Sequence, residues 1–207
     1  MSVPNVDRVW YAAYGSNLLR ERFLLYLRGG RFRGGGQPHG GARDDADPQS
    51  DRIIEVDHQM HFGRHSSRWN GGVSFLDPTP GGSAFVRCWS VTLEQFADIA
   101  AQENGREAGT LDVDLDRLVS DGHADLTDRW YGKGLLLGHL EGAPVVTFTT
   151  PTLVEPTAPG EMYLMVILQG LVETGSSPES AVGYVLTCPG VPTAWSREQL
   201  LALAVGR

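Results

Sequence analysis

The segment Arg8–Leu27, RVWYAAYGSNLLRERFLLYL, joins an apolar, aromatic run to an amphipathic run through a short polar corner. Val9–Tyr14 predicts a buried strand, because aromatic and apolar side chains fill a length that is typical of strands. Leu18–Arg28 predicts a helix in which apolar and charged residues mix, and Ser16 or Asn17 can cap it. The sequence therefore predicts a sharp strand-to-helix turn close to its start.

The glycine of this corner, Gly15, lets backbone amides turn outwards. With the free N–H groups at the start of a helix, such amides form a pocket for an anion or for a developing oxyanion. A glycine between a strand and a helix is also common as a purely structural turn, so the corner alone leaves both interpretations open. A serine hydrolase built on Ser16 is not indicated, because the corner lacks the second glycine of a G-x-S-x-G elbow.

Length and composition limit the class of protein. The chain has 207 residues, which predicts a single domain over residues 1–207 with enough length to bury a core. Its hydrophobic fraction of 41% and charged fraction of 20% are ordinary for a soluble globular protein. The formal net charge of -8 argues against nucleic-acid binding, which depends on a cationic face. Cys88 and Cys188 lack CxxC spacing and are expected to be reduced structural thiols.

We find neither an apolar run of about 18 residues nor an apolar signal-peptide core. The sequence therefore predicts a cytoplasmic protein without a membrane segment.

A segment rich in Gly, Arg and Asp, residues 28–51, follows the first predicted helix. It has almost nothing to bury, so it predicts a flexible insertion over about residues 29–52, favoured over an ordered lid. Short strands and helices follow without an internal repeat, which predicts an α+β fold. The expected strands are Ile53–Phe62, Val73–Leu76 and Ala84–Val91, with a hairpin of Leu135–Leu140 and Val145–Thr149 around Glu141-Gly142; the expected later helices include Met162–Val172 and two that start at Ser177-Pro178 and Ser196.

The helix predicted from Leu93 carries a carboxylate near its end. Thr92 and Gln95 have the spacing of a capping box, and Gly105 is a stop signal. If the helix is regular, Glu103 lies on its apolar face in the last turn, where the helix dipole is negative. Burial and the dipole both oppose a negative charge there, which is how a general base is tuned. The alternative is a helix that ends earlier and leaves Glu103 in water.

Three histidines, His58, His61 and His65, suggest a metal site at first sight. On a strand, His58 and His61 point to opposite faces and cannot share one ion, so no metal site is predicted. For Trp69, a core or edge aromatic residue is favoured over a side chain that stacks on a substrate.

Three segments together resemble the γ-glutamyl cyclotransferase family. YAAYGSNL, Tyr11–Leu18, is similar to the family's aromatic strand that leads into YGSN. His61–Gly105 resembles its strand, W-x-G-G turn, strand and helix that ends at the catalytic glutamate. APGEMYLMVILQGL, Ala158–Leu171, resembles its proline-led helix with a substrate-contacting tyrosine. The resemblance covers about residues 8–28, 58–107 and 158–184 and implies the family's fold, a small mixed β-barrel with flanking helices.

The resemblance also implies a cyclisation that uses no metal or cofactor. In the family, the α-amine of a γ-glutamyl compound attacks its γ-carbonyl, a ring closes to 5-oxoproline, and an amine or amino acid leaves. By the same match Glu103 is the general acid/base, since a carboxylate can accept the proton that the α-ammonium must lose. The positions that match substrate-binding residues are Tyr11, Ala12, Ala13, Tyr14, Gly15, Ser16, Asn17 and Tyr163.

The identity of the substrate stays open at this point. Asn17 argues against the glutathione-specific branch of the superfamily, which usually has YGSL. Two alternatives share the fold: a non-catalytic small-molecule binding module, and a pathway-specific enzyme that deprotects a γ-glutamylated intermediate. The 29–52 insertion and Leu111–Pro156 do not match the family's pattern, and either could shape the substrate side. We expect a small-molecule γ-glutamyl substrate and neither a nucleic-acid nor a membrane partner, and we leave a homodimer open.

Overall fold

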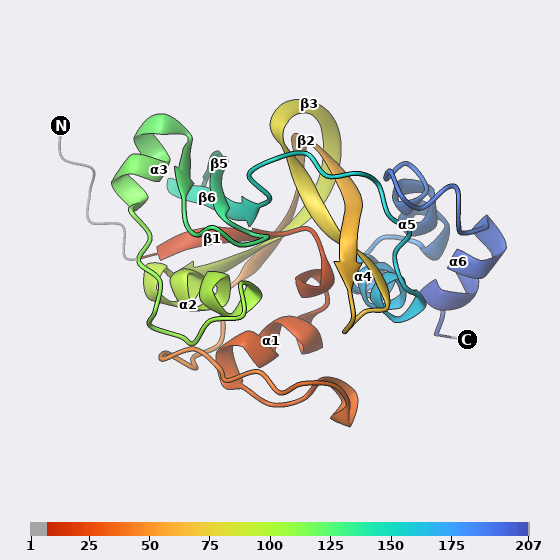
Figure 1. The fold of residues 1–207 in the computed structure, drawn as a ribbon, viewed down its shortest axis with the longest axis horizontal. Helices are drawn as coiled ribbons and strands as arrows, with labels where there is room; N and C mark the ends of the chain where they lie inside the picture. The colour runs from red at the N-terminus through yellow and green to blue at the C-terminus, as the bar shows by residue number, and fades with distance from the viewer. Residues whose placement is uncertain (1–7, 207) are drawn as a thin grey trace. The chain divides into compact units, whose positions relative to one another are not determined.

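The computed structural model describes residues 8–206, and its α+β architecture confirms the predicted class (Figure 1). The strands form one mixed sheet in the order β2-β3-β1-β6-β5-β4, in which β1 is antiparallel to β3 and parallel to β6. The strands are β1 Arg8–Ala13, β2 Asp51–Ser66, β3 Gly71–Thr92, β4 His123–Asp125, β5 Lys133–Leu140 and β6 Ala143–Thr149. The helices are η1 Ser16–Leu18, α1 Arg20–Arg28, η2 Phe32–Gly34, α2 Leu93–Glu103, α3 Leu115–Asp121, α4 Glu161–Glu173, α5 Pro178–Val185 and α6 Arg197–Ala204, where η marks a 3₁₀ helix.

The chain divides into two compact units that are built from interleaved segments. The prediction of a single domain is not tested by this division and stays a prediction. One boundary falls at the YGSN corner, between Ala13 and Tyr14. Unit 1 consists of the chain up to Ala13, Leu24–Ile54 and Arg87–Pro151, and unit 2 consists of Tyr14–Phe23, Glu55–Val86 and Thr152–Arg207.

In unit 1 the core forms around β1, which lies between two other strands. Tyr11 is paired with Trp89 of β3 on one side and with Val146 of β6 on the other. Helix α2 packs on this strand, with the ring centroids of Tyr11 and Phe96 5.8 Å apart. The predicted capping box of Thr92 is present, so the start of α2 is as expected.

The segment between α1 and β2 makes defined contacts with the rest of unit 1. Gly30 and His39 form an isolated antiparallel bridge, and the side-chain amide of Gln95 on α2 donates to the carbonyl oxygens of Asp44 (3.2 Å) and Ala46 (2.9 Å). These contacts hold part of the insertion against α2. Its flexibility, predicted for residues 29–52, is not tested by these contacts.

In unit 2, helices α4, α5 and α6 pack against one another, as Figure 1 shows in blue. Helix α4 also packs closely on η1 through Gly170. A β-carbon at position 170 would lie 2.7 Å from the β-carbon of Leu18 and 2.7 Å from the amide nitrogen of Leu19. The glycine is therefore required for this close approach.

Three local predictions were wrong. The strands predicted at Val73–Leu76 and Ala84–Val91 are parts of the single strand β3, which continues without a break through the exposed residues 79–82. The helix predicted from Leu18 begins at Arg20, after the 3₁₀ turn η1. Ser16 and Asn17 lie inside that turn, and neither side chain caps it. Helix α3 and strand β4 were not predicted.

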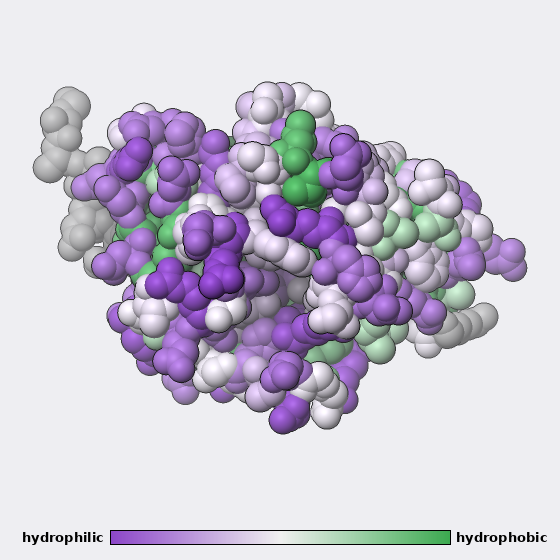
Figure 2. All heavy atoms as spheres, in the orientation of Figure 1, coloured by the Kyte–Doolittle hydropathy of each residue, from purple (hydrophilic) through white to green (hydrophobic). Residues whose placement is uncertain are grey.

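The visible face of the surface is mostly polar (Figure 2). Figure 2 shows a face that is mainly hydrophilic, with small separate hydrophobic patches. Within residues 8–206, no helix combines the length and the apolar character needed to cross a bilayer.

Candidate functional site

The first predicted site residues, Tyr11, Ala12 and Ala13, lie in β1 of unit 1 and are at most 3% exposed. The Tyr11 ring packs on Phe148 at a centroid distance of 5.3 Å, and the carbonyl of Ala12 accepts a hydrogen bond of 2.7 Å from the Thr147 hydroxyl. Their side chains therefore belong to the core. Their contribution to a site can only come from the strand end that leads into the YGSN turn.

The turn itself belongs to unit 2, and Gly15 is its most exposed residue. Tyr14, Ser16 and Asn17 are buried, which leaves the backbone around Gly15 as the accessible part. In the part of the chain that the structure describes, the amides of Gly15 and Ser16 donate to no other main-chain group. Two neighbouring amide donors of this kind can bind a carboxylate or a carbonyl oxygen that gains negative charge.

Tyr163 on α4 lies against this turn, and a serine that sequence reasoning missed lies between them. The hydroxyls of Tyr163 and Ser74 are 2.7 Å apart, and the Ser74 amide donates to the tyrosine oxygen at 3.2 Å. A β-carbon on Gly15 would lie 2.3 Å from the Ser74 Oγ and 2.9 Å from the Tyr163 hydroxyl oxygen. We call Gly15, Ser74 and Tyr163 the Gly15 cluster; in it both hydroxyls meet the backbone of the turn.

The W-x-G-G turn supports this cluster from the side of α4. The Trp69 ring lies 4.9 Å from the ring of Tyr163, and the guanidinium of Arg22 lies 5.7 Å from the centre of the Trp69 ring. A β-carbon on Gly71 would be 2.4 Å from the Gly160 amide nitrogen, so the glycine allows the turn to contact the start of α4 directly. Trp69 thus packs on Tyr163, and the choice between an edge aromatic residue and a side chain that stacks on a substrate is not tested by this contact.

Glu103 is the last residue of α2 in unit 1 and is half-buried. It lines a cavity of about 210 Å³ together with Asn104, Arg129 and Trp130. The side-chain amide of Asn104 donates to the Tyr131 carbonyl and accepts from the Tyr131 amide, both at 3.1 Å, so the cavity wall is fixed to the end of the helix. The expected helix end is confirmed, and the alternative of an earlier end is wrong.

Asp98, one and a half turns before Glu103, holds α2 in place and was missed by sequence reasoning. Its buried carboxylate accepts hydrogen bonds from the side chain and the amide of Arg43 and from the amide of Gly109. Burial alone would raise the pKa of Asp98, but the Arg43 hydrogen bonds, the Gly109 amide and the Arg43 charge outweigh it and lower that pKa. No local pattern marks Asp98, because its partners Arg43 and Gly109 lie 55 and 11 positions away in the sequence.

Among residues 8–206, no three His, Cys, Asp or Glu side chains lie close enough to hold a metal ion. The Nδ1–H of His58 donates to the carbonyl of Asp77 (2.8 Å), whereas His61 lines a separate cavity in unit 2. Cys88 and Cys188 are free and buried, and burial raises the pKa of each thiol to about 12.

Comparison with known proteins adds two kinds of similarity. No protein-family model matches the sequence. Histone deacetylase 5 of Arabidopsis thaliana is 35% identical to this chain in an alignment 203 residues long. The alignment covers 86% of this chain. The chain spans only 30% of the length of that relative.

Solved structures share the fold at low sequence identity. A γ-glutamyl cyclotransferase has a TM-score of 0.52 and 18% identity, covering 97% of this chain and 99% of that chain. An uncharacterized Homo sapiens protein has a TM-score of 0.50 and 18% identity, covering 94% and 98%. YkqA from Bacillus subtilis has a TM-score of 0.50 and 15% identity, covering 87% and 54%. The predicted fold, a mixed sheet with flanking helices as in γ-glutamyl cyclotransferase, is therefore confirmed.

Proposed function

We propose that this chain is a γ-glutamyl cyclotransferase that releases 5-oxoproline from a small γ-glutamyl compound. The observation that carries the proposal is the position of Glu103, half-buried at the end of α2 and lining a cavity, in a chain with this fold. The likeness in fold supports the reaction class, and the glutamate supplies the one group that the chemistry cannot do without.

The reaction needs a base for the substrate's α-ammonium, whose ordinary pKa is about 8. Glu103 accepts that proton, the freed amine attacks the γ-carbonyl, and the C–N bond to the leaving amine breaks as the ring closes. The same carboxyl group then gives the proton to the departing nitrogen. The cyclisation consumes no water, so a site that excludes water favours cyclisation over hydrolysis.

The second requirement is a donor for the γ-carbonyl oxygen, which gains negative charge as the amine attacks. The amides of Gly15 and Ser16 are suited to this task, and the Gly15 cluster fixes their position. Helix α2 packs on β1, and β1 continues directly into the turn through the Ala13–Tyr14 peptide bond. We propose that the turn supplies these donors to the γ-carbonyl oxygen.

The residues beside Glu103 favour a leaving group that carries a carboxylate. Arg129 has an exposed guanidinium, and it lines the same cavity as Glu103. Its charge contact with the neighbouring Asp128 is a long one, at 3.8 Å between nitrogen and oxygen. An α-carboxylate of a departing amino acid would bind this guanidinium, so we propose γ-glutamyl amino acids as the substrate class, ahead of γ-glutamyl amines.

The test is mass-spectrometric detection of 5-oxoproline from γ-glutamyl amino acids, γ-glutamyl amines and glutathione. Glu103→Gln should lower turnover by about 10²–10⁴-fold, the range for loss of a general base, with an unchanged circular dichroism spectrum. Glu107→Gln, which changes an exposed carboxylate four residues on, is the matched control and should retain full activity. Wild-type turnover in Glu103→Gln would refute the assignment.

The Arabidopsis relative suggests a second reaction for the same preparation. Its name describes a histone deacetylase, and the 35% identity is the observation that favours testing it. We expect no acetate from an acetylated histone peptide under conditions that yield 5-oxoproline. Release of acetate without any 5-oxoproline would refute the proposed function and support the activity that the relative's name describes.

A further inference from the structure

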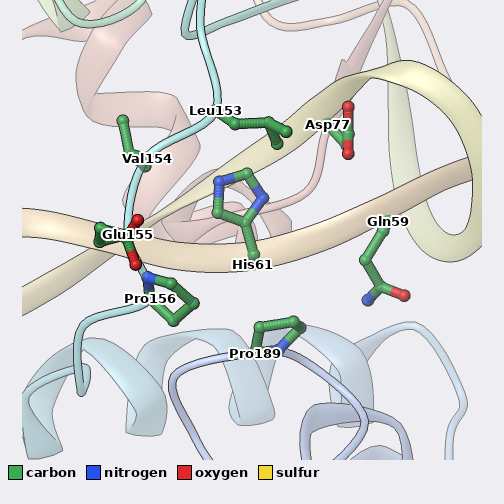
Figure 3. A pocket seen from close by; sticks show the side chains of 8 residues that line it. All are labelled: Gln59, His61, Asp77, Leu153, Val154, Glu155, Pro156 and Pro189. Atoms are coloured by element: carbon green, nitrogen blue, oxygen red, sulfur yellow. The ribbon is translucent and has the colours of Figure 1, made fainter.

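A second cavity, of about 310 Å³, lies in unit 2 and shares no residue with the Gly15 cluster or with the Glu103 cavity. That volume is at the lower end of the range of small-molecule sites, about 300–1,000 Å³. Figure 3 shows side chains from β2, from β3 and from two loops converging on it. It is lined by Gln59, His61, Asp77, Leu153, Val154, Glu155, Pro156 and Pro189.

Main-chain contacts to β2 fix the walls of this cavity. The Phe62 amide donates to the carbonyl of Pro189, and the Thr157 amide donates to the carbonyl of Phe62, each at 2.9 Å. Gly63 lets the loop 153–156 lie directly on the strand, because a β-carbon there would be 2.3 Å from the Cγ2 of Val154. The cavity is therefore formed by the fold itself before any ligand binds.

His61 is the floor of the cavity and is 4% exposed. Figure 3 shows its imidazole pointing from β2 towards Leu153 and Val154. Its Nε2 atom has no hydrogen-bond partner in the part of the chain that the structure describes. Buried polar atoms are nearly always paired, so an unpaired one beside a cavity points to a missing ligand group.

The charged groups around His61 favour a cationic ligand. Burial lowers the pKa of His61, against the opposing effects of the Asp77 charge and a hydrogen bond to the Gln59 main chain, so the ring is neutral near pH 7. Asp77 and Glu155 bring two carboxylates, and the lining contains neither lysine nor arginine. One Asp77 oxygen accepts from the Thr79 amide at 2.8 Å, which leaves the other for a ligand. A cation is therefore attracted, and an anion is repelled.

We propose that this cavity binds a small primary amine with a short apolar body. The ammonium group binds the carboxylate of Asp77, Glu155 on the opposite wall adds a second negative charge, and the body packs on Leu153, Pro156 and Pro189 (Figure 3). A further N–H or O–H of the ligand pairs with Nε2 of His61. The site is independent of the cyclisation, because none of these residues has a role in it.

The experiment titrates the full chain with three probes of one shape: 2-phenylethylamine, 2-phenylethanol and phenylacetate. Calorimetry gives the affinities at pH 7, and amide chemical shifts locate the binding. We expect the amine to bind at least about tenfold more tightly than the alcohol, and phenylacetate to bind more weakly than either. The shifts should concentrate on residues 59–63, 77 and 153–156.

Glu155→Gln and Asp77→Asn test the charge contacts without opening the core. Asp77→Asn should weaken amine binding by about tenfold, Glu155→Gln should weaken it by less, and both should leave alcohol binding unchanged. The exposed Glu179→Gln on α5 should change neither affinity. The proposal is overturned if no probe binds, if amine and alcohol bind equally, or if the two carboxylate variants bind the amine as well as the wild type does. Because the readout is binding, loss of cyclotransferase activity cannot produce the same result.

Discussion

A methyl group at position 15 is the most direct perturbation of the candidate site, because the structure shows what it would meet. In Gly15→Ala the new β-carbon would lie 2.3 Å from the Ser74 Oγ and 2.9 Å from the Tyr163 hydroxyl oxygen. Real β-carbons do not approach other atoms so closely, so the turn or the hydroxyl pair must move. Overpacking of this kind costs about 1–3 kcal/mol.

The cost is measurable by thermal unfolding. For a chain of this size 1 kcal/mol shifts the melting temperature by about 2–4 °C, so Gly15→Ala should lower it by about 2–12 °C. Activity should fall further than stability explains, because the displaced backbone carries the Gly15 and Ser16 amides.

A double-mutant cycle with Ser74→Ala shows whether the clash is the cause. Ser74→Ala alone removes the 2.7 Å hydrogen bond to Tyr163 and should cost about 1 kcal/mol. It also removes the atom nearest to the new methyl, so Gly15→Ala/Ser74→Ala should be more stable than the sum of the single changes predicts. Strict additivity, or a Gly15→Ala protein with wild-type stability and turnover, would refute the steric account.

Three further predictions concern other parts of the molecule. Asp98→Asn should lose about 2 kcal/mol of stability near pH 7, because the Gly109 and Arg43 donors then meet an uncharged side chain. Folding lowers the pKa of Asp98, so its carboxylate adds its full share to the free energy of unfolding above the unfolded pKa of about 3.9. This share is lost as the pH falls through the folded pKa. The free energies of unfolding of wild type and variant should therefore converge in urea titrations at acid pH. Arg129→Ala should raise KM for γ-glutamyl amino acids and leave it unchanged for γ-glutamyl amines, which steady-state kinetics with both substrates would show. Native Cys88 and Cys188 should resist iodoacetamide at pH 8 and react only after unfolding, because burial raises the pKa of both thiols to about 12.

Local sequence patterns correctly predicted the elements whose start or turn depends on residues close together in the sequence. The capping boxes at Thr92 and Ser196 start α2 and α6 as expected, and Glu141-Gly142 forms the turn between β5 and β6 with positive φ at both residues (52° and 82°). These features depend on residues a few positions apart, and such patterns are legible without the rest of the fold.

The local signals failed where the sheet decided the outcome. Pro78 and the glycines after it have the composition of a loop, yet β3 continues through them. Gly82 shows why: its amide donates to the Asp57 side chain at 3.1 Å, and a β-carbon there would lie 2.6 Å from the Gln59 amide nitrogen. The partner strand β2 therefore keeps this exposed part extended, and no residue next to Gly82 in sequence carries that information.

The candidate site shows the same division between what a motif can specify and what only the fold supplies. The YGSN turn is visible as a motif, but the group that fixes it is not, since Ser74 meets Tyr163 across 89 positions of sequence. A serine in a strand has no local mark that separates it from any other serine. Gly15 has two interpretations: a turn that needs a flexible backbone, or a position where a side chain would clash with a neighbour. The positions of the Ser74 and Tyr163 oxygens support the second interpretation. The glycine is needed here because two hydroxyls occupy the space of its side chain, and its φ of -113° would be open to other residues. Substitution by serine or alanine should therefore fail for steric reasons alone, and relief by a smaller residue at position 74 is the signature that distinguishes this cause from lost backbone freedom.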